Sequence, residues 1–270
     1  MKAPLFQVDA FTTRRFAGNP AAVMLLEAYP EDETLRAIAA ENNLSETAFL
    51  VREGGDYHLR WFTPKVEVPL CGHATLASAS VVMERLEPGR ASVTFHTASG
   101  ALPVSRSGTG YVLDFPARGS EPIAMPGVAA ALGAAPEEVR INPFTYMAVL
   151  ADAATVRGLS PDMAAIAALD RPGLIVTAPG DNAYDVVSRY FAPAKGIPED
   201  PVTGAAHTTL VPYWAERLGR STLACHQASA RGGDLTCRLS DDRVLIEGAC
   251  VFFLEGTAEY GTETKRQART

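Results

Sequence analysis

The sequence predicts an α+β protein of two similar domains, each a curled, mostly antiparallel sheet wrapped around a central helix. Three observations support this fold class. One pattern occurs twice, about 129 residues apart, at positions 61 and 190; strand-like segments dominate both halves; and each half has one long apolar helical segment. A sheet curled around such a helix buries both. We place the first domain at 1–116, to which a final strand near 258–265 is added, and the second at 117–270.

Each copy of the repeat passes from an aromatic strand end, through a proline-rich loop, to a helix that starts on small residues. The first copy comprises 61–64 (WFTP) and 69–75 (PLCGHAT), and the second comprises 190–193 (YFAP) and 198–207 (PEDPVTGAAH). A helix that begins on glycine and alanine leaves its first backbone N–H groups open to bind an anion. Two such helix starts predict a small anionic carboxylate substrate held between the domains.

In the first half, the apolar patterns and the turn residues predict the elements in chain order. Helix 31–41 follows from apolar residues at helical spacing, and helix 73–87 ends at a Pro-Gly pair. A hairpin turn is predicted at 107–110 (SGTG). The strands are predicted at 4–10, 21–26, 47–52, 57–63, 91–97, 101–106 and 110–115.

The second half repeats this scheme after a proline-rich linker at 116–126. Helices are predicted at 126–133, 160–168 and 204–218, and Pro212 is expected to kink the last of them. The strands are predicted at 144–151, 173–178, 184–192, 221–229, 234–239, 243–247 and 250–259.

The composition restricts the class of function. The 270 residues carry a net charge of −7, which argues against a nucleic-acid or anionic-membrane partner, because both need a basic face. No apolar stretch approaches membrane-spanning length, no signal-peptide core precedes the first strand, and the four cysteines form no CxxC pair. These features predict a cytoplasmic protein with reduced thiols.

Four residues are candidates for chemistry, and each has a simpler alternative. Glu46, where a helix gives way to an apolar strand, is a proton-transfer group with a raised pKa or an exposed loop carboxylate. Asp200, just before Pro201, points at the substrate or only caps the next helix. His73, at a helix start, is a neutral donor to the substrate or a structural histidine. Cys71 is a low-pKa thiolate or a small buried hydrophobe.

Motifs for nucleotides and metals do not occur in the sequence. There is no GxGxxG after a strand, no GxxxxGK, no HExxH and no GxSxG. The five histidines show no short metal-ligand spacing. We therefore expect no cofactor and no metal.

Taken together, these segments resemble the PhzF-like family of phenazine biosynthesis, which has the diaminopimelate-epimerase-like fold. The resemblance spans almost the whole chain, and it depends on the order and spacing of several short segments. They are 7–11 (QVDAF), 16–20 (FAGNP), 43–49 (NLSETAF), 70–75 (LCGHAT), 199–204 (EDPVTG) and 227–233 (QASARGG).

The resemblance implies a homodimer, with an active site in the cleft between the two domains of each chain. It implies a cofactor-independent isomerase in which Glu46 moves a proton between atoms of the substrate, with His73 and Asp200 as further catalytic residues. The residues expected to bind the substrate are Gly72, Cys71, Ala74, Thr203, Gly204 and Ala205.

Two departures from the family pattern affect the choice of substrate and mechanism. Ala205 stands where the phenazine enzyme has a substrate-contacting serine, which puts that substrate in doubt. The second repeat has no cysteine to match Cys71, and inversion of a carbon needs an acid and a base on opposite faces. The leading hypothesis is therefore a proton-shifting isomerase. The alternatives are an epimerase, racemase or dehydratase that uses Cys71, and a member that binds metabolites or proteins without catalysis.

Overall fold

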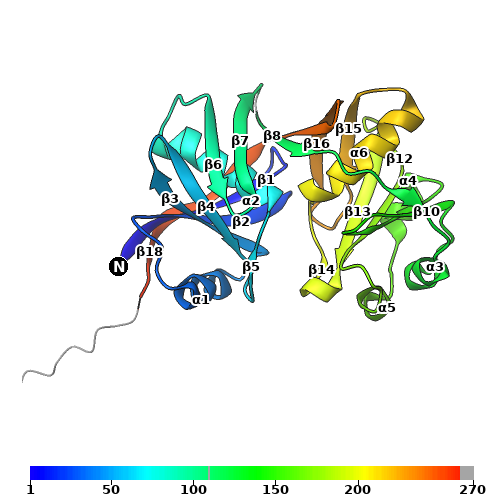
Figure 1. Ribbon diagram of the computed structural model, residues 1–270, viewed down its shortest axis with the longest axis horizontal. Coiled ribbons are helices and arrows are strands. Elements are labelled where there is room, and N and C mark those ends of the chain that lie inside the picture. Colours follow the sequence, from blue (N-terminus) through cyan, green and yellow to red (C-terminus); the bar gives the residue numbers. More distant parts are fainter. Residues whose placement is uncertain (109, 262–270) are drawn as a thin grey trace, which may run out of the picture.

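The computed structural model describes residues 1–108 and 110–261. They form two lobes that lie side by side, with strands passing between them (Figure 1). The predicted turn at 107–110 and the end of the predicted strand near 258–265 include residues outside the described ranges. Within those ranges, no helix is long and apolar enough to cross a membrane.

The first lobe is a curled sheet around helix α2 (Gly72–Val81), with helix α1 (Asp32–Asn42) on the outer side (Figure 1). All 10 residues of α2 are buried. Most of them are Gly, Ala, Ser or Thr, which are small enough for strands to pack closely around the helix. The strands are β1 (Lys2–Ala10), β2 (Asn19–Leu26), β3 (Glu46–Glu53), β4 (Asp56–Phe62), β5 (Glu67–Val68), β6 (Ser92–Thr97), β7 (Gly100–Ser107), β8 (Gly110–Pro116) and β18 (Cys250–Glu259).

The second lobe has the same plan around helix α6 (Gly204–Leu218). Side chains of its sheet alternate between α6 on one face and the short helices α3 (Pro126–Leu132), α4 (Ala153–Gly158) and α5 (Met163–Ala167) on the other. A 3₁₀ turn spans Pro193–Lys195. The strands are β9 (Glu121–Pro122), β10 (Glu138–Ile141), β11 (Tyr146–Val149), β12 (Leu174–Pro179), β13 (Val186–Ala192), β14 (Ile197–Glu199), β15 (Thr222–Gln227), β16 (Gly233–Ser240) and β17 (Arg243–Gly248).

The two lobes share one pattern of strand pairing. β2–β3 and β4–β6 are parallel pairs in the first lobe, and β11–β12 and β13–β15 are the matching parallel pairs in the second. β18 pairs with β1, β9 pairs with β10, and the antiparallel pair β8–β17 joins the lobes. The predicted fold class is confirmed, whereas the domain boundary at 116 stays a prediction.

The second lobe also contains elements that the sequence pattern did not predict. Helix α4 starts after Asp152, whose carboxylate accepts the Thr155 N–H at 2.7 Å. Asp162 caps α5 in the same way, so the helix predicted at 160–168 begins only at Met163. Strand β10 has four residues, which is too short for a period of two to be recognised.

Two of the predicted helices differ from an ideal α-helix. The helix predicted at 73–87 is α-helical only to Val81 and ends in a π-helical turn over Val82–Leu86. Helix α6 continues through Pro212, which lacks an N–H and leaves the Thr208 carbonyl without its helical partner. The backbone N–H of Arg118 donates to that carbonyl at 2.9 Å. This bond attaches the linker between the lobes to α6.

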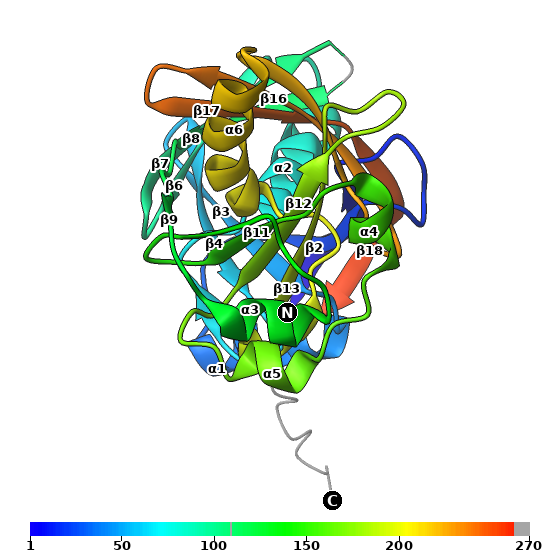
Figure 2. The same ribbon diagram turned by 90° about the vertical axis from the view of Figure 1, so that its right-hand side faces the viewer.

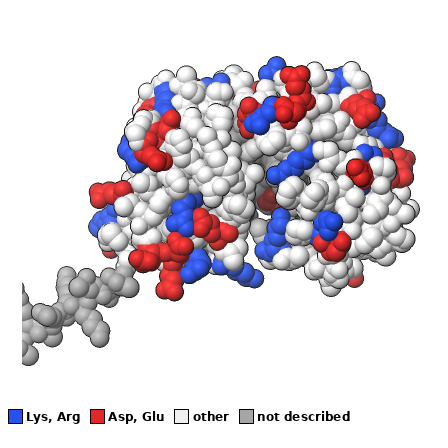
Figure 3. Space-filling view, viewed as in Figure 1, with Lys and Arg blue, Asp and Glu red and all other residues white. Residues whose placement is uncertain are grey.

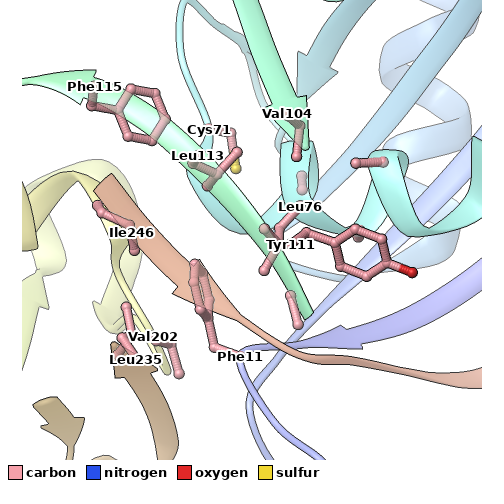
Figure 4. Close-up of a cluster of buried hydrophobic side chains, with 14 of the residues drawn as sticks. Phe11, Cys71, Leu76, Val104, Tyr111, Leu113, Phe115, Val202, Leu235 and Ile246 are labelled. Carbon is pink, nitrogen blue, oxygen red and sulfur yellow. The ribbon is translucent and has the colours of Figure 1, made fainter. Parts of the chain in front are cut away.

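The apolar core continues from one lobe into the other. Figure 4 shows a cluster of buried side chains from both lobes, among them Phe11, Leu113, Phe115, Val202, Leu235 and Ile246. The Phe11 ring lies so close to Gly248 that a Cβ at that glycine would be 2.3 Å from the ring. Because such a core is densely packed, the lobes hold their central helices at a fixed separation.

Candidate active site

The starts of α2 and α6 meet between the two lobes. The helices lie on either side of the lobe boundary in Figure 1 and one behind the other in Figure 2. A Cβ built on Gly204 would lie 3.7 Å from the Cα of Gly72. The first N–H groups of each helix have no acceptor within their own helix, so their partial positive charges converge here.

Two adjoining chambers open at this point. The inner chamber has a volume of about 120 Å³ and the outer chamber about 660 Å³. Figure 3 shows the hollow between the lobes, with basic side chains beside it. Residues that line the inner chamber include Cys71, Gly72, His73, Asp200, Thr203 and Gly204. Both chambers are lined by Glu46, Leu70, Tyr190, Lys195, Ile197 and Ala205.

A separate groove of about 410 Å³ lies on the second lobe. Most of its polar groups already have partners: Arg140 pairs with Glu138, and the Tyr213 hydroxyl donates to the same glutamate at 3.0 Å. Groups paired in this way do not point to a ligand, so we assign the chemistry to the two chambers between the lobes.

Glu46 begins strand β3, and 12% of its side chain is exposed. Burial, followed by the charge of Asp200, raises the pKa of Glu46 to about 8, although a hydrogen bond with Cys71 opposes the rise. A carboxyl group with this pKa exchanges protons near neutral pH. The simpler alternative, an exposed loop glutamate, is wrong.

His73 is held as a neutral imidazole. Its Nε2 lies 3.4 Å from Oε2 of Glu46, and burial lowers the pKa of the ring to about 3. The amide nitrogen of Asn19 lies 3.1 Å from Nδ1. The two hydrogens of that amide are directed to nearer acceptors, Asp200 Oδ1 at 2.7 Å and the Val202 carbonyl at 2.9 Å, so the contact with Nδ1 is not a third full hydrogen bond. Because an amide nitrogen cannot accept and a carboxylate oxygen lies beside Nε2, we assign the single ring proton to Nε2. His73 therefore presents a neutral N–H to Glu46.

Asn19 also connects the pair of Glu46 and His73 to Asp200. Its amide nitrogen donates to Asp200 Oδ1 at 2.7 Å and to the Val202 carbonyl at 2.9 Å, and the Thr203 hydroxyl donates to the other carboxylate oxygen. Burial raises the pKa of Asp200 to about 6, against the effect of these hydrogen bonds. The alternative in which Asp200 only caps α6 is wrong, because the N-cap residue is Thr203.

Cys71 is the buried N-cap residue of α2. Its Sγ lies 3.5 Å from Nδ1 of His73. Burial first, and then the neighbouring Glu46, raise the pKa of this thiol well above its usual value. This environment favours a protonated, buried thiol over a reactive thiolate.

Loops from both lobes hold Asn19 in place. Arg231 of the second lobe pairs with the buried Asp9 at 2.8 Å and donates to the Gly18 carbonyl at 2.8 Å. The Gly18 N–H in turn donates to the Gly232 carbonyl at 2.7 Å. Asn19 follows directly, so its side chain is aimed at Asp200 by contacts between segments that lie far apart in the sequence.

The structure brings the predicted catalytic residues Glu46, His73 and Asp200 together at the inner chamber. Of the residues predicted to bind substrate, those that line this chamber are Cys71, Gly72, Thr203, Gly204 and Ala205. Ala74 does not: its side chain is part of the core of the first lobe. The roles of these residues in binding and catalysis stay predictions.

Sequence reasoning missed four polar residues at the site: Asn19 and the three cations Lys65, Arg118 and Lys195. The two lysines carried a signal, because each repeat has a lysine within two residues of its Phe-x-Pro segment. Asn19 lies within one of the segments that carried the family resemblance. Arg118 had no local signal.

Glu46, Cys71 and His73 offer ligand atoms that all lie within 4.8 Å of one another. A carboxylate, a thiolate and an imidazole are ligands that Zn²⁺ accepts. The absence of a metal requirement, expected from the sequence, therefore stays a prediction, and chelation belongs in any test of activity.

Comparison with known proteins gives relatives along nearly the whole chain. Residues 8–256 match the family PhzC-PhzF, described as phenazine biosynthesis-like protein. A Pseudomonas aeruginosa protein named as an uncharacterized isomerase is 50% identical over 258 residues, which cover 95% of this chain and 99% of that protein. The crystal structure of a phenazine biosynthesis protein of the PhzF family from Enterococcus faecalis has a TM-score of 0.93 and 46% identity, covering 96% of this chain and 100% of that chain.

A more distant structure shares the fold alone. A probable proline racemase from Agrobacterium radiobacter is 10% identical, with a TM-score of 0.60 over 98% of this chain and 94% of that one. The two similar domains thus occur beyond the near relatives. Given the family match and the near-complete coverage of those relatives, this chain belongs to the PhzC-PhzF family of phenazine biosynthesis-like proteins.

Proposed function

We propose that this chain is a cofactor-independent isomerase that shifts a proton within a small carboxylate-bearing substrate. The observation that carries this proposal is the place of Glu46, on the wall of both chambers, beside a neutral histidine and close to two helix starts. A group that takes a proton from carbon and returns it to another atom needs a pKa near the working pH. The isomerase name of a relative that is 50% identical agrees with this class of reaction.

In the proposed reaction, the N–H groups at Gly72 and Gly204 bind the substrate carboxylate. Ionised Glu46 then removes a proton from a substrate carbon, and the electron pair moves into the conjugated system of the substrate. Protonated Glu46 gives the same proton to a different carbon, so no oxidant or co-reactant is consumed. His73 Nε2 has no hydrogen-bond partner in the described part of the chain and lies 3.4 Å from Glu46 Oε2, so a neutral N–H there would steady the ionised carboxylate without adding a charge.

An epimerase, racemase or dehydratase that uses Cys71 is the second candidate. It is disfavoured because Thr203 occupies in α6 the N-cap position that Cys71 occupies in α2, so the opposite helix supplies no thiol. The raised pKa of Cys71 also keeps the group protonated at neutral pH. A Cys71→Ala variant that folds and loses all turnover would restore this candidate.

Deuterium transfer tests the proposal directly. The protein is incubated in D₂O with a panel of unsaturated cyclic and amino carboxylates, and proton positions are followed by NMR. We expect one substrate class to become an isomer with its hydrogen on a different carbon, with and without EDTA. A panel that is bound but unchanged would favour the non-catalytic alternative, and activity that is lost on chelation and restored by one metal would contradict a cofactor-independent reaction.

We further propose that the chain forms a homodimer, as the family resemblance implies. Large apolar side chains are exposed near strand β18: Phe16 is 72% exposed, Phe253 46% and Leu254 43%. The rings of Phe16 and Phe253 pack edge to face, with their centroids 5.7 Å apart, and so form one continuous apolar patch. Light scattering should give twice the chain mass of 28.7 kDa, and a Phe253→Ser variant should shift the mass toward the monomer. A wild-type mass of one chain at micromolar concentration would exclude a stable dimer.

A further inference from the structure

We propose that the outer chamber binds a second acidic group of the substrate through Lys65, Arg118 and Lys195. This inference rests on the proposed function and narrows its substrate class. The substrate would be a dianion, with one carboxylate at the two helix starts and a second acidic group, a carboxylate or a phosphate, in the outer chamber.

The three cations reach the chamber from three separate segments. Lys65 follows β4 in the first lobe, Lys195 follows β13 at the matching place in the second lobe, and Arg118 lies in the linker. All three line the outer chamber, together with Glu46. Segments distant in sequence thus converge on one cavity and supply it with three positive charges.

These cations differ from other basic residues around the site in having no acidic partner in the described part of the chain. Arg60 pairs with Glu67 at 2.7 Å, and Arg189 pairs with Glu199 at 2.7 Å. Among residues 1–108 and 110–261, no carboxylate lies within ion-pair distance of the three chamber cations. Their charge is therefore available to a ligand.

The contacts of Arg118 leave its charge uncompensated, whereas the charge of Lys195 also acts, beyond ion-pair distance, on Glu46 and Asp200. The Arg118 guanidinium stacks on the Phe144 ring at 4.3 Å, and Lys195 Nζ lies 3.4 Å from the Tyr190 hydroxyl. Arg118 is half-buried, and burial lowers the pKa of its guanidinium. A cation that has lost water without gaining an anion is costly, so an acidic ligand group would relieve this cost.

The backbone holds these side chains in the chamber. Arg118 is attached to α6 through the Thr208 carbonyl freed by Pro212, and the Lys65 N–H donates to the Thr63 hydroxyl at 3.2 Å. The walls between the cations and Glu46 are apolar or aromatic and include Val66, Val68, Leu70, Tyr190 and Ile197. Such walls fit an unsaturated or ring-shaped body between the two acidic groups.

Binding of paired probes tests the second anion site without requiring turnover. Calorimetry compares benzoate with isophthalate and hexanoate with adipate, on the wild type and on Arg118→Gln and Lys65→Gln variants. We expect at least one dicarboxylate to bind about tenfold or more tightly than its monocarboxylate partner, because charge-assisted hydrogen bonds are the strong ones. Each variant should remove most of this advantage and leave the monocarboxylate affinity within about twofold.

Two control variants separate loss of the chamber charge from a general change in charge or folding. Lys2→Gln removes an exposed lysine far from the chamber, which pairs with Glu259, and should change nothing. Arg118→Lys should recover part of the dicarboxylate affinity, which excludes a folding defect as the cause. A stronger affinity for 3-carboxyphenyl phosphate than for isophthalate would assign the second group as phosphate, and the reverse as carboxylate.

Two results would overturn the inference. One is equal affinity of the wild type for both dicarboxylates and their monocarboxylate partners. The other is an Arg118→Gln variant that weakens both kinds of probe equally, because Arg118 would then serve the first carboxylate. Either result would leave the isomerase proposal standing, since that proposal depends on proton transfer by Glu46.

Discussion

Replacing Glu46 with glutamine is expected to lower kcat by roughly 10²–10⁴-fold and to leave KM nearly unchanged. Glutamine keeps the volume and most of the hydrogen bonding of the side chain, but it cannot carry a proton between two atoms of the substrate. The helix starts at Gly72 and Gly204 still hold the carboxylate in the variant. Steady-state kinetics on the substrate identified by deuterium transfer would measure both constants.

The same variant should be at least as stable as the wild type above pH 7. In the unfolded chain Glu46 loses its proton near its ordinary pKa of 4.5, whereas the folded chain keeps it to about pH 8. The folded state therefore binds more protons between these values, and the stability of the wild type falls as the pH rises through them. Glu46→Gln removes that loss, which thermal melts at pH 5 and pH 8 would show.

Glu53→Gln is the matched control for both measurements, because Glu53 is exposed at the far end of the same strand. It should leave kcat and the pH dependence of stability unchanged. Near-normal turnover by a folded Glu46→Gln variant would remove Glu46 from the mechanism and direct attention to Cys71 or Asp200.

The repeat made the fold and the centre of the site predictable. Aromatic strand ends at 61–64 and 190–193, each followed by a helix that starts on small residues, are local signals. Duplicated signals imply duplicated structure, and the two helices do meet at Gly72 and Gly204. The place of Glu46, where a helix gives way to an apolar strand, left an exposed loop carboxylate as the simpler alternative, and the family resemblance singled it out as the proton-transfer group.

The remainder of the site depends on contacts between distant segments, which leave no periodic trace in the sequence. Asn19 reaches Asp200 only because Arg231, more than 200 positions away, holds the loop before it. Arg118 is fixed by the carbonyl that Pro212 frees in α6. From the local sequence, Pro212 predicts only a disturbed helix. That it frees the Thr208 carbonyl to bind the linker becomes visible only in the three-dimensional structure.

The pH dependence of kcat/KM is expected to shift to lower pH when Asp200 is replaced by asparagine. In the wild type Glu46 must be ionised to accept a proton, so kcat/KM should rise with pH and level off above about pH 8. After burial, the charge of Asp200 is the next cause of that raised pKa. Asparagine removes the charge, so the pKa of Glu46 falls and the midpoint moves below that of the wild type.

We also expect the plateau of kcat/KM to fall by about 10²-fold in Asp200→Asn, because the variant loses a second proton-carrying group beside the inner chamber. Asn19 can still donate to the amide oxygen and the Thr203 hydroxyl can turn to accept from the amide N–H, so the variant should fold. Asp181→Asn, which removes an exposed carboxylate paired with Arg157, should leave both midpoint and plateau unchanged. A lowered plateau with an unmoved midpoint would mean that the charge of Asp200 does not act on Glu46. The midpoint therefore distinguishes electrostatic coupling from a purely structural role, which rate measurements at a single pH cannot do.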